Sequence, residues 1–343
     1  MEFTLLYALV AFAGGAMGAI FGCLLAFIFV AVVIAAGLGM GGSLETLGVL
    51  GFGGWGFYAP QISFAGGAFA SAYAGWRGYQ KSGQDITTAL VSLKKPDVLL
   101  MGGVGGLLGY LCMFIHAMTP LKTWMDSVPF AVVVPALIAK IVFDGSVFGP
   151  TSPEAKAAGG RFNVNSPVVW LPYNCTGLEK LLTAAIMGVG GAYATYILAQ
   201  NPNTAAWAAF LPFCISVFSL IGFYFGMAIV PNHHMVYCAS FGVLMSMSNG
   251  VGVAMLWGVS MAVMAHFWAD FSARACHLYS KKAGNHFDPP TAGIWLATIF
   301  IVGIFPRIGA YANPGLAVAV PVVVLAVACI LAIVDQVQLK KKA

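Results

Sequence analysis

Long apolar runs that contain no charged side chain constrain this chain more than any other feature of its sequence. The first runs from residue 4 to residue 40, and another runs from residue 314 to residue 334. Charged residues make up only 8% of the 343 residues, whereas soluble domains carry roughly 25%. A soluble fold of this length has no means of hiding so much apolar surface. The sequence therefore predicts an all-α protein that crosses a membrane many times.

Eleven segments are long and apolar enough to be candidate membrane crossings, since a hydrocarbon core of about 30 Å needs about 20 helical residues. They are residues 4–21, 22–40, 60–76, 98–117, 127–146, 178–199, 205–229, 233–248, 251–271, 289–305 and 314–335. The N-terminus is acidic and enters the first segment directly, which favours a spanning helix over a cleavable signal. One long tilted helix over residues 4–40 is the alternative for the first two segments. Segments 60–76 and 233–248 are short for a complete crossing.

The placement of basic residues predicts the orientation. With eleven crossings and the N-terminus outside, every Lys and Arg except Lys122 and Arg307 falls on the cytoplasmic side. Such an excess on one side is typical of the cytoplasmic face of membrane proteins. We therefore expect a protein of the cell (inner) membrane with its C-terminus in the cytoplasm. The basic segment 271–287 is interpreted as facing anionic lipid of the inner leaflet.

Four pairs of segments resemble each other in the same order along the chain. Residues 8–22 match 184–198, each with a glycine pair, and residues 52–74 match 225–246, each with a proline before a helix rich in small residues. Residues 101–118 match 249–267, and residues 126–134 match 288–296, where an Asp and a Pro precede an apolar run. The pattern predicts an internal duplication.

Each predicted copy holds five crossings, an odd number, so the second copy enters the membrane upside down relative to the first. The expected organisation is repeat 1 at 1–146, a cytoplasmic linker at 147–177 that could cover the inner mouth, inverted repeat 2 at 178–306, and an extra helix with a basic tail at 307–343. Inverted repeats are typical of transporters, whose sites lie near the membrane midplane where the repeats meet.

Five plus five plus one crossings, N-terminus outside and C-terminus inside, resembles the architecture of ammonium channels, and five plus five also resembles urea transporters. The signature motifs of neither family occur here, so no functional residue is carried over. The resemblance implies a conducting protein that forms oligomers, and it implies nothing about the solute.

Two prolines, Pro60 and Pro231, open matching helices, and proline suits a first helical turn because it lacks the N–H that would be unpaired there. In lipid, unpaired N–H groups are tolerated where they face protein, ligand or a wet cavity. The candidate binding residues that follow these prolines are Gln61, Ser63, Asn232, His233 and His234. Helix N-termini favour an anion. The alternative is ordinary helix capping at the membrane surface, with the histidines solvated there.

Other ionisable residues are weaker candidates. Asp126 and Asp288 open matching segments and are predicted either as two mouths of a pathway or simply as helix N-caps. Asp270 and Arg274, four residues apart, are expected to form a structural ion pair. His116 and His266 match in sequence, but inversion is expected to place them far apart.

The sequence favours no enzyme, cofactor or metal site. It holds no phosphate loop of the form GxxxxGK and no set of residues that suggests Ser-His-Asp catalysis. Adjacent histidines lie about 100° apart on a helix, which argues against a shared zinc ion. We expect a transporter or channel for a small polar or ionic solute that forms a homo-oligomer, contacts membrane lipids and binds no nucleic acid. The alternatives are a non-conducting scaffold or anchor subunit and, less favoured, an intramembrane enzyme.

Overall fold

The computed structural model describes residues 4–39 and 57–340, and these residues form helices and loops without any β-strand. The helices are α1 (Leu5–Phe21), α2 (Cys23–Gly39), α4 (Ser63–Trp76), α5 (Pro96–Met118), α6 (Ser127–Ala139), α7 (Pro153–Ala157), α8 (Gly177–Gln200), α9 (Phe210–Phe218), α10 (His233–Ser246), α11 (Val251–Ser272), α12 (Pro289–Thr298), α13 (Phe305–Arg307) and α14 (Pro314–Lys340). Each predicted segment overlaps one of them. The all-α prediction is confirmed for this part of the chain.

Six of these helical segments are long and apolar enough to cross a membrane. They are Pro96–Met118, Ser127–Asp144, Gly177–Gln200, Val251–His277, Pro289–Arg307 and Pro314–Lys340. Three of them continue α6, α11 and α12 through a π-helical turn. By length and composition the described residues are those of a helical membrane protein with six such segments, or seven if α1 and α2 count as one broken span.

The chain turns by 115° between α1 and α2, so residues 4–39 are not one continuous helix. Gly22 at the turn has φ +85°, a conformation that L side chains rarely adopt. The loop after α4 packs into the bend, where the Leu24 N–H donates to the Ile86 carbonyl at 3.0 Å. The alternative of one long tilted helix is therefore wrong.

The helices α4 and α10 each have 14 residues, which corresponds to about 21 Å and is shorter than a hydrocarbon core. Both begin inside the protein: Ser63 and His234 are fully buried at their N-terminal turns. Neither helix is a complete crossing by itself.

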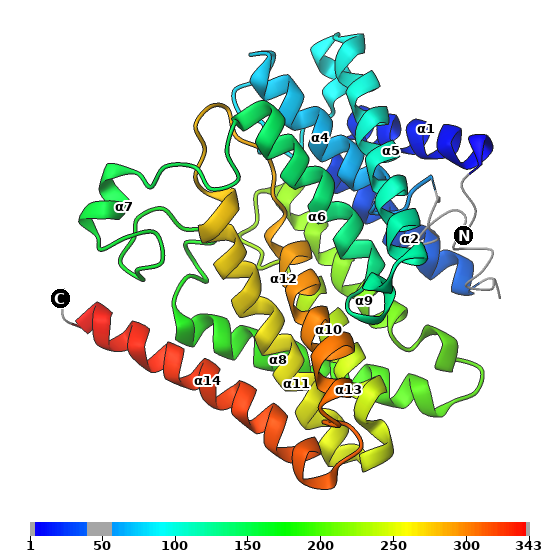
Figure 1. The fold of residues 1–343 in the computed structure, drawn as a ribbon, viewed down its shortest axis with the longest axis vertical. Coiled ribbons are helices and arrows are strands. Elements are labelled where there is room, and N and C mark those ends of the chain that lie inside the picture. The colour runs from blue at the N-terminus through cyan, green and yellow to red at the C-terminus, as the bar shows by residue number, and fades with distance from the viewer. Residues whose placement is uncertain (1–3, 40–56, 341–343) are drawn as a thin grey trace.

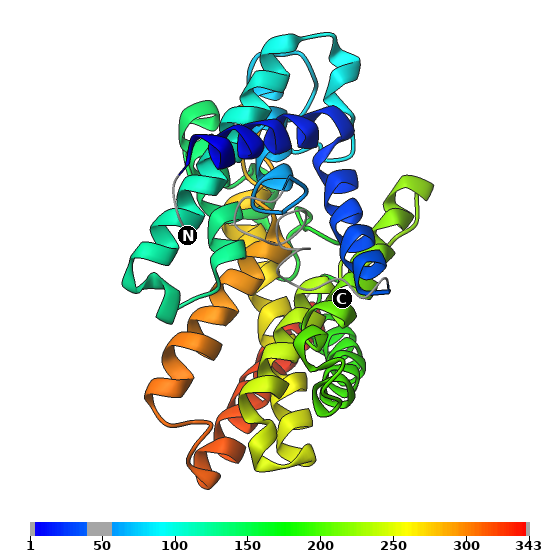
Figure 2. The ribbon, with the colours of Figure 1, turned by 90° about the vertical axis from the view of Figure 1, so that its right-hand side faces the viewer.

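Two groups of helices with the same internal contacts make up most of the fold (Figure 1). In the first group α1 packs on α4 and α5, and α5 packs on α6; in the second α8 packs on α10 and α11, and α11 packs on α12. Figures 1 and 2 place the first group at one end of the molecule and the second at the other. α2 packs on α9 and α6 packs on α12, which joins the groups, while α14 lies along α8 and α11.

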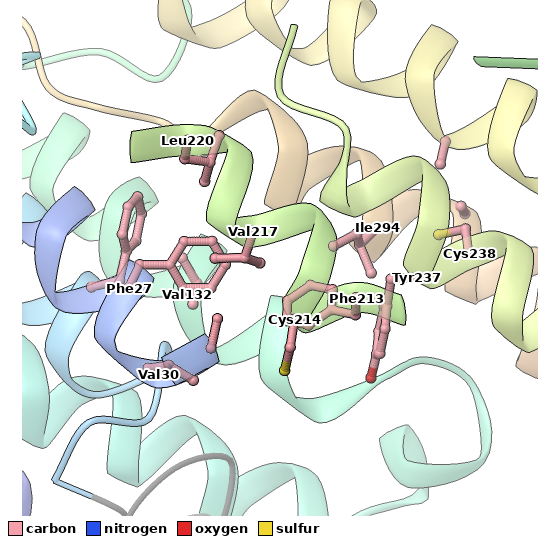
Figure 3. Packing of buried hydrophobic residues seen from close by; sticks show 14 of the residues in the cluster. Phe27, Val30, Val132, Phe213, Cys214, Val217, Leu220, Tyr237, Cys238 and Ile294 are labelled. Carbon is pink, nitrogen blue, oxygen red and sulfur yellow. The ribbon is translucent and has the colours of Figure 1, made fainter. Parts of the chain in front are cut away.

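The main hydrophobic core lies at this junction. It contains Phe27 from α2, Val132 from α6, Phe213 from α9, Tyr237 from α10 and Ile294 from α12, each less than one tenth exposed. Figure 3 shows these side chains packed together, although they come from both halves of the chain. The fold therefore brings α2, α6, α9, α10 and α12 to one place, and the polar residues near their ends line the candidate site.

Candidate functional site

A cavity of about 90 Å³ lies at the junction of the two helix groups. We call it the central cavity. Pro60 and Phe64 line it from the first group, and Pro231 and His233 line it from the second. A smaller cavity of about 30 Å³ shares Pro60 and His233 with it and extends to Tyr237. The two prolines predicted to open matching helices therefore line one cavity.

Asp288 is the acidic residue that lines the central cavity, and it is held by its neighbours. Its Oδ1 lies 2.9 Å from the His286 Nε2, and its Oδ2 accepts the Thr291 N–H at 2.8 Å and the Thr291 hydroxyl. Asp288 is thus the N-cap of α12, as the capping alternative predicted. It also lines the cavity beside His286 and Thr291, so the same carboxylate both caps α12 and contributes to the candidate site.

His233 is held by two aromatic rings in the wall that both cavities share. Its ring centroid lies 5.2 Å from that of Phe27 and 6.0 Å from that of Phe213, both edge to face. The ring is 3% exposed, and its Nδ1 has no hydrogen-bond partner among the described residues. A buried polar atom without a partner is costly, and it is a place where a solute or water gains a hydrogen bond.

His234 lines neither cavity and begins a buried chain of hydrogen bonds. Its Nε2 lies 2.9 Å from the His266 Nδ1, and the His266 Nε2 lies 2.7 Å from the Asn174 Oδ1. The Asn174 amide donates in turn to the Thr183 hydroxyl at 2.8 Å, which orients it. An amide oxygen only accepts, so in the neutral rings each Nε2 must carry the proton. The chain therefore leaves a lone pair on the His234 Nδ1, which has no partner in the described part of the protein.

Asn232 precedes these histidines without capping α10. Its side chain makes no capping hydrogen bond, and its buried Oδ1 has no partner among residues 4–39 and 57–340. Asn232 and His234 thus present buried acceptors at one helix N-terminus, and the His233 Nδ1 between them accepts or donates according to the tautomer of its ring. His233 is the member of this set that lines a cavity.

Gln61 and Ser63 are fully buried but line neither cavity. The Ser63 hydroxyl donates to the Tyr58 and Ala59 carbonyls at 3.0 and 3.2 Å. The backbone carbonyl of Gln61 packs closely against Gly109, since a Cβ added to Gly109 would lie 1.7 Å from the carbonyl oxygen. The two residues serve the packing of α4 between α1 and α5. Of the five predicted binding residues, His233 alone lines either of these two cavities, whereas both prolines line the central one.

Asp126 is the N-cap of α6 and accepts the Val128 N–H at 3.1 Å. It lines neither cavity, but its Oδ2 accepts the hydroxyl of Tyr237, a residue that lines the smaller one, at 2.9 Å. Capping is therefore present at Asp126 as it is at Asp288.

Several lining residues were not predicted. His286 precedes Asp288 by two residues, a signal that the sequence offered, yet it lies in the segment 271–287 that was interpreted as facing lipid. The structure buries His277, Asn285 and His286, so that interpretation is wrong for this part of the segment. Trp170, from the linker, also lines the central cavity. Nothing local in its sequence indicated this contact.

Two buried ion-pair groups lie outside the cavities described so far. The predicted pair of Asp270 and Arg274 is present, with Nε and Oδ2 2.9 Å apart, and Lys180 joins it at 2.7 Å. Lys140 pairs with Asp144 at 3.5 Å, and both side chains are fully buried. In residues 4–39 and 57–340, no three His, Cys, Asp or Glu side chains form a group that could hold a metal ion.

One family model matches nearly the whole chain, in two stretches at residues 1–157 and 150–320. Its description is "Family of unknown function (DUF7973)". No curated protein and no solved structure matches the chain.

Proposed function

The chain belongs to DUF7973, a family of unknown function, and we propose that it is a membrane transporter or channel that moves a small polar solute through the central cavity. One observation carries the proposal: Pro60 and Pro231, each next to the start of a short buried helix, face the same cavity from opposite halves of the chain. Half-helices that end at a shared polar site inside the membrane are typical of transporters.

The proposed architecture is a pair of inverted repeats, residues 1–146 and 178–306, with the N-terminus outside and α14 leading to a cytoplasmic C-terminus. One observation supports the duplication: α1, α4, α5 and α6 have the same mutual neighbours as α8, α10, α11 and α12. In this arrangement the linker lies on the cytoplasmic side, where Trp170 covers one side of the cavity.

The proposed solute is small and donates hydrogen bonds. The central cavity of about 90 Å³ holds a few water molecules, since one water needs roughly 10–15 Å³ of such space. The Asp288 carboxylate is an acceptor, and no Lys or Arg of the described chain lines either cavity. This lining favours a neutral or cationic solute. Helix N-termini by themselves favour an anion, but the Asp288 carboxylate in the lining disfavours one.

A non-conducting scaffold is the alternative. It needs no polar cavity at its centre, and the absence of Gln61 and Ser63 from both cavities is compatible with it. The cavity between the two prolines supports transport over that alternative.

The proposal is tested by flux measurements on the full chain reconstituted in liposomes. Small neutral and cationic solutes (urea, glycerol, ammonium, methylammonium and alkali cations) are compared with chloride and formate. We expect one of the first group to cross faster than in empty liposomes. His233→Ala and Asp288→Asn are expected to lower that rate at least tenfold.

Thr195→Val is the matched control, because Thr195 is equally buried and lines neither cavity. Its rate should equal that of the unmodified protein. Transport of none of these solutes, or rates unchanged in both cavity variants, contradicts the proposal.

A further inference from the structure

A second and larger cavity of about 490 Å³ lies between α14 and the rest of the second helix group. We call it the α14 cavity. It shares no lining residue with the central cavity and lies against α11, α14 and the linker. Its volume is typical of sites that hold an organic ligand rather than a few waters. One end is charged and the remainder is apolar.

At the charged end one carboxylate, that of Asp270, pairs with two cations. The Asp270 Oδ2 lies 2.7 Å from the Lys180 Nζ and 2.9 Å from the Arg274 Nε. The other charged residue of the lining, Asp335, accepts the Gly177 N–H at 2.7 Å, and this N–H belongs to the N-terminal turn of α8. A helix N-terminus compensates a carboxylate. The group of Lys180, Asp270 and Arg274 therefore keeps a net positive charge.

Lys180 is the residue of this group whose N–H donors are left for a ligand. The Arg274 guanidinium also donates to the carbonyls of Arg161, Asn163 and Cys175. The Lys180 ammonium has three donors, and within the described chain its hydrogen-bond partner is Asp270, while the Phe267 ring lies 5.4 Å from it. Two donors of a buried ammonium thus lie at the cavity without a protein acceptor.

The apolar part of the α14 cavity opens towards the surroundings along α14. Val327 and Leu331 line it and are 51% and 46% exposed, and Phe267 and Phe271 of α11 line the opposite wall. Beside a helix of this hydropathy the surroundings are acyl chains rather than water. An occupant must therefore combine a long apolar part with a compact negative group.

We propose that the α14 cavity binds an anionic phospholipid, with one acyl chain between α11 and α14 and the phosphate on Lys180. A net positive group between membrane helices, next to an apolar groove, suits such a headgroup. A zwitterionic lipid places its own cation beside Lys180 and Arg274 and binds less well. The site does not depend on conduction through the central cavity.

Native mass spectrometry tests whether the α14 cavity prefers an anionic lipid. The full-length protein in detergent is titrated with phosphatidylglycerol and with phosphatidylcholine that has the same acyl chains. We expect phosphatidylglycerol to bind at least tenfold more tightly. Lys180→Gln keeps a donor for Asp270 but removes the charge, and it should lose this preference. Lys122→Gln, at an exposed residue outside the cavity, should keep it.

A second pair of variants tests whether the lipid binds in the α14 cavity, without disturbing the ion pairs. Val327→Trp fills the cavity and should weaken binding of phosphatidylglycerol at least tenfold, whereas Ile330→Trp, at an equally exposed position of α14 that does not line it, should not. Equal affinity for both lipids, or unchanged binding in Val327→Trp, overturns the proposal. If Lys180→Gln does not fold, the tryptophan pair and the lipid comparison decide.

Discussion

The Tyr237 hydroxyl donates a hydrogen bond of 2.9 Å to the Asp126 carboxylate, across 111 residues of sequence. Tyr237 belongs to α10, and Asp126 caps α6, so the bond ties the second helix group to the first beside the cavities. Val132 of α6 and Tyr237 also belong to the same hydrophobic core.

Tyr237→Phe is expected to destabilise the protein by about 1–3 kcal/mol, because it leaves a buried carboxylate oxygen without its donor. The unfolding temperature in detergent measures this. Tyr193→Phe is the control, since Tyr193 is 61% exposed on α8. Equal unfolding temperatures for Tyr237→Phe and the unmodified protein would show that the bond contributes nothing.

Gly109→Ala is expected to cost at least about 1–3 kcal/mol, because its Cβ would lie 1.7 Å from the Gln61 carbonyl and force α4 away from α5. Gly190→Ala is the matched change in α8, where nothing lies within 4 Å of the added Cβ. Alanine there should stabilise the helix by up to about 1 kcal/mol. Thermal unfolding of both variants measures this: we expect a lower unfolding temperature for Gly109→Ala and a higher one for Gly190→Ala. An unchanged unfolding temperature for Gly109→Ala would contradict the close packing of the first group.

Asp144→Ala is expected to release the loop before α12. Asp144 accepts the N–H groups of Lys281 and Lys282 at 3.1 and 2.9 Å and pairs with the buried Lys140. Trypsin should cut after Lys281 and Lys282 at least several times faster, and the loss of one partner of a buried pair should cost about 3–5 kcal/mol.

The double variant Lys140→Met/Asp144→Leu separates these two effects. It removes both charges and should recover much of the stability, but cleavage after Lys281 should stay fast. Cleavage after the exposed Lys94 is the internal reference. If that site accelerates equally, the variants loosen the whole fold and the pinning of the loop is not shown.

Trp170→Ala is expected to open the central cavity to reagents. In a background with Cys175→Ser and Cys329→Ser, which removes the two cysteines that are not buried, Thr291→Cys reports access to the cavity. A charged methanethiosulfonate reagent should label it about tenfold faster once Trp170 is removed. Phe162→Ala, in the same linker but outside this cavity, should leave the rate unchanged. Equal rates in both variants would show that Trp170 does not cover the cavity.

Much of the local structure was predictable because its causes are local. The start of α6 at Asp126, the start of α12 at Asp288 and the place of Pro231 before α10 follow from capping and proline chemistry within a few residues. The ion pair of Asp270 and Arg274 follows from their spacing of one helical turn. The break at Gly22 was only one of two alternatives, since an apolar run is equally consistent with a straight helix.

The candidate site was predictable only in part. Pro60 and Pro231 line one cavity, but Gln61 and Ser63 do not. The backbone carbonyl of Gln61 packs on Gly109 of α5, and that of Ser63 packs on Gly18 of α1. His234 hydrogen-bonds to His266, which in turn hydrogen-bonds to Asn174. Such choices depend on partners many residues away, and no short stretch of sequence indicates them.

By itself the sequence determined that this chain is helical, where most of its helices begin, and that it needs an apolar environment, because helix formation and the burial of apolar surface depend on residue type and local spacing. Only the tertiary structure decided which side chains meet. His286 and Phe64 face one cavity with their ring centroids 5.9 Å apart, and Lys180 joins Asp270 across 90 residues. Those contacts arise from how whole helices cross, a geometry that many distant side chains set together.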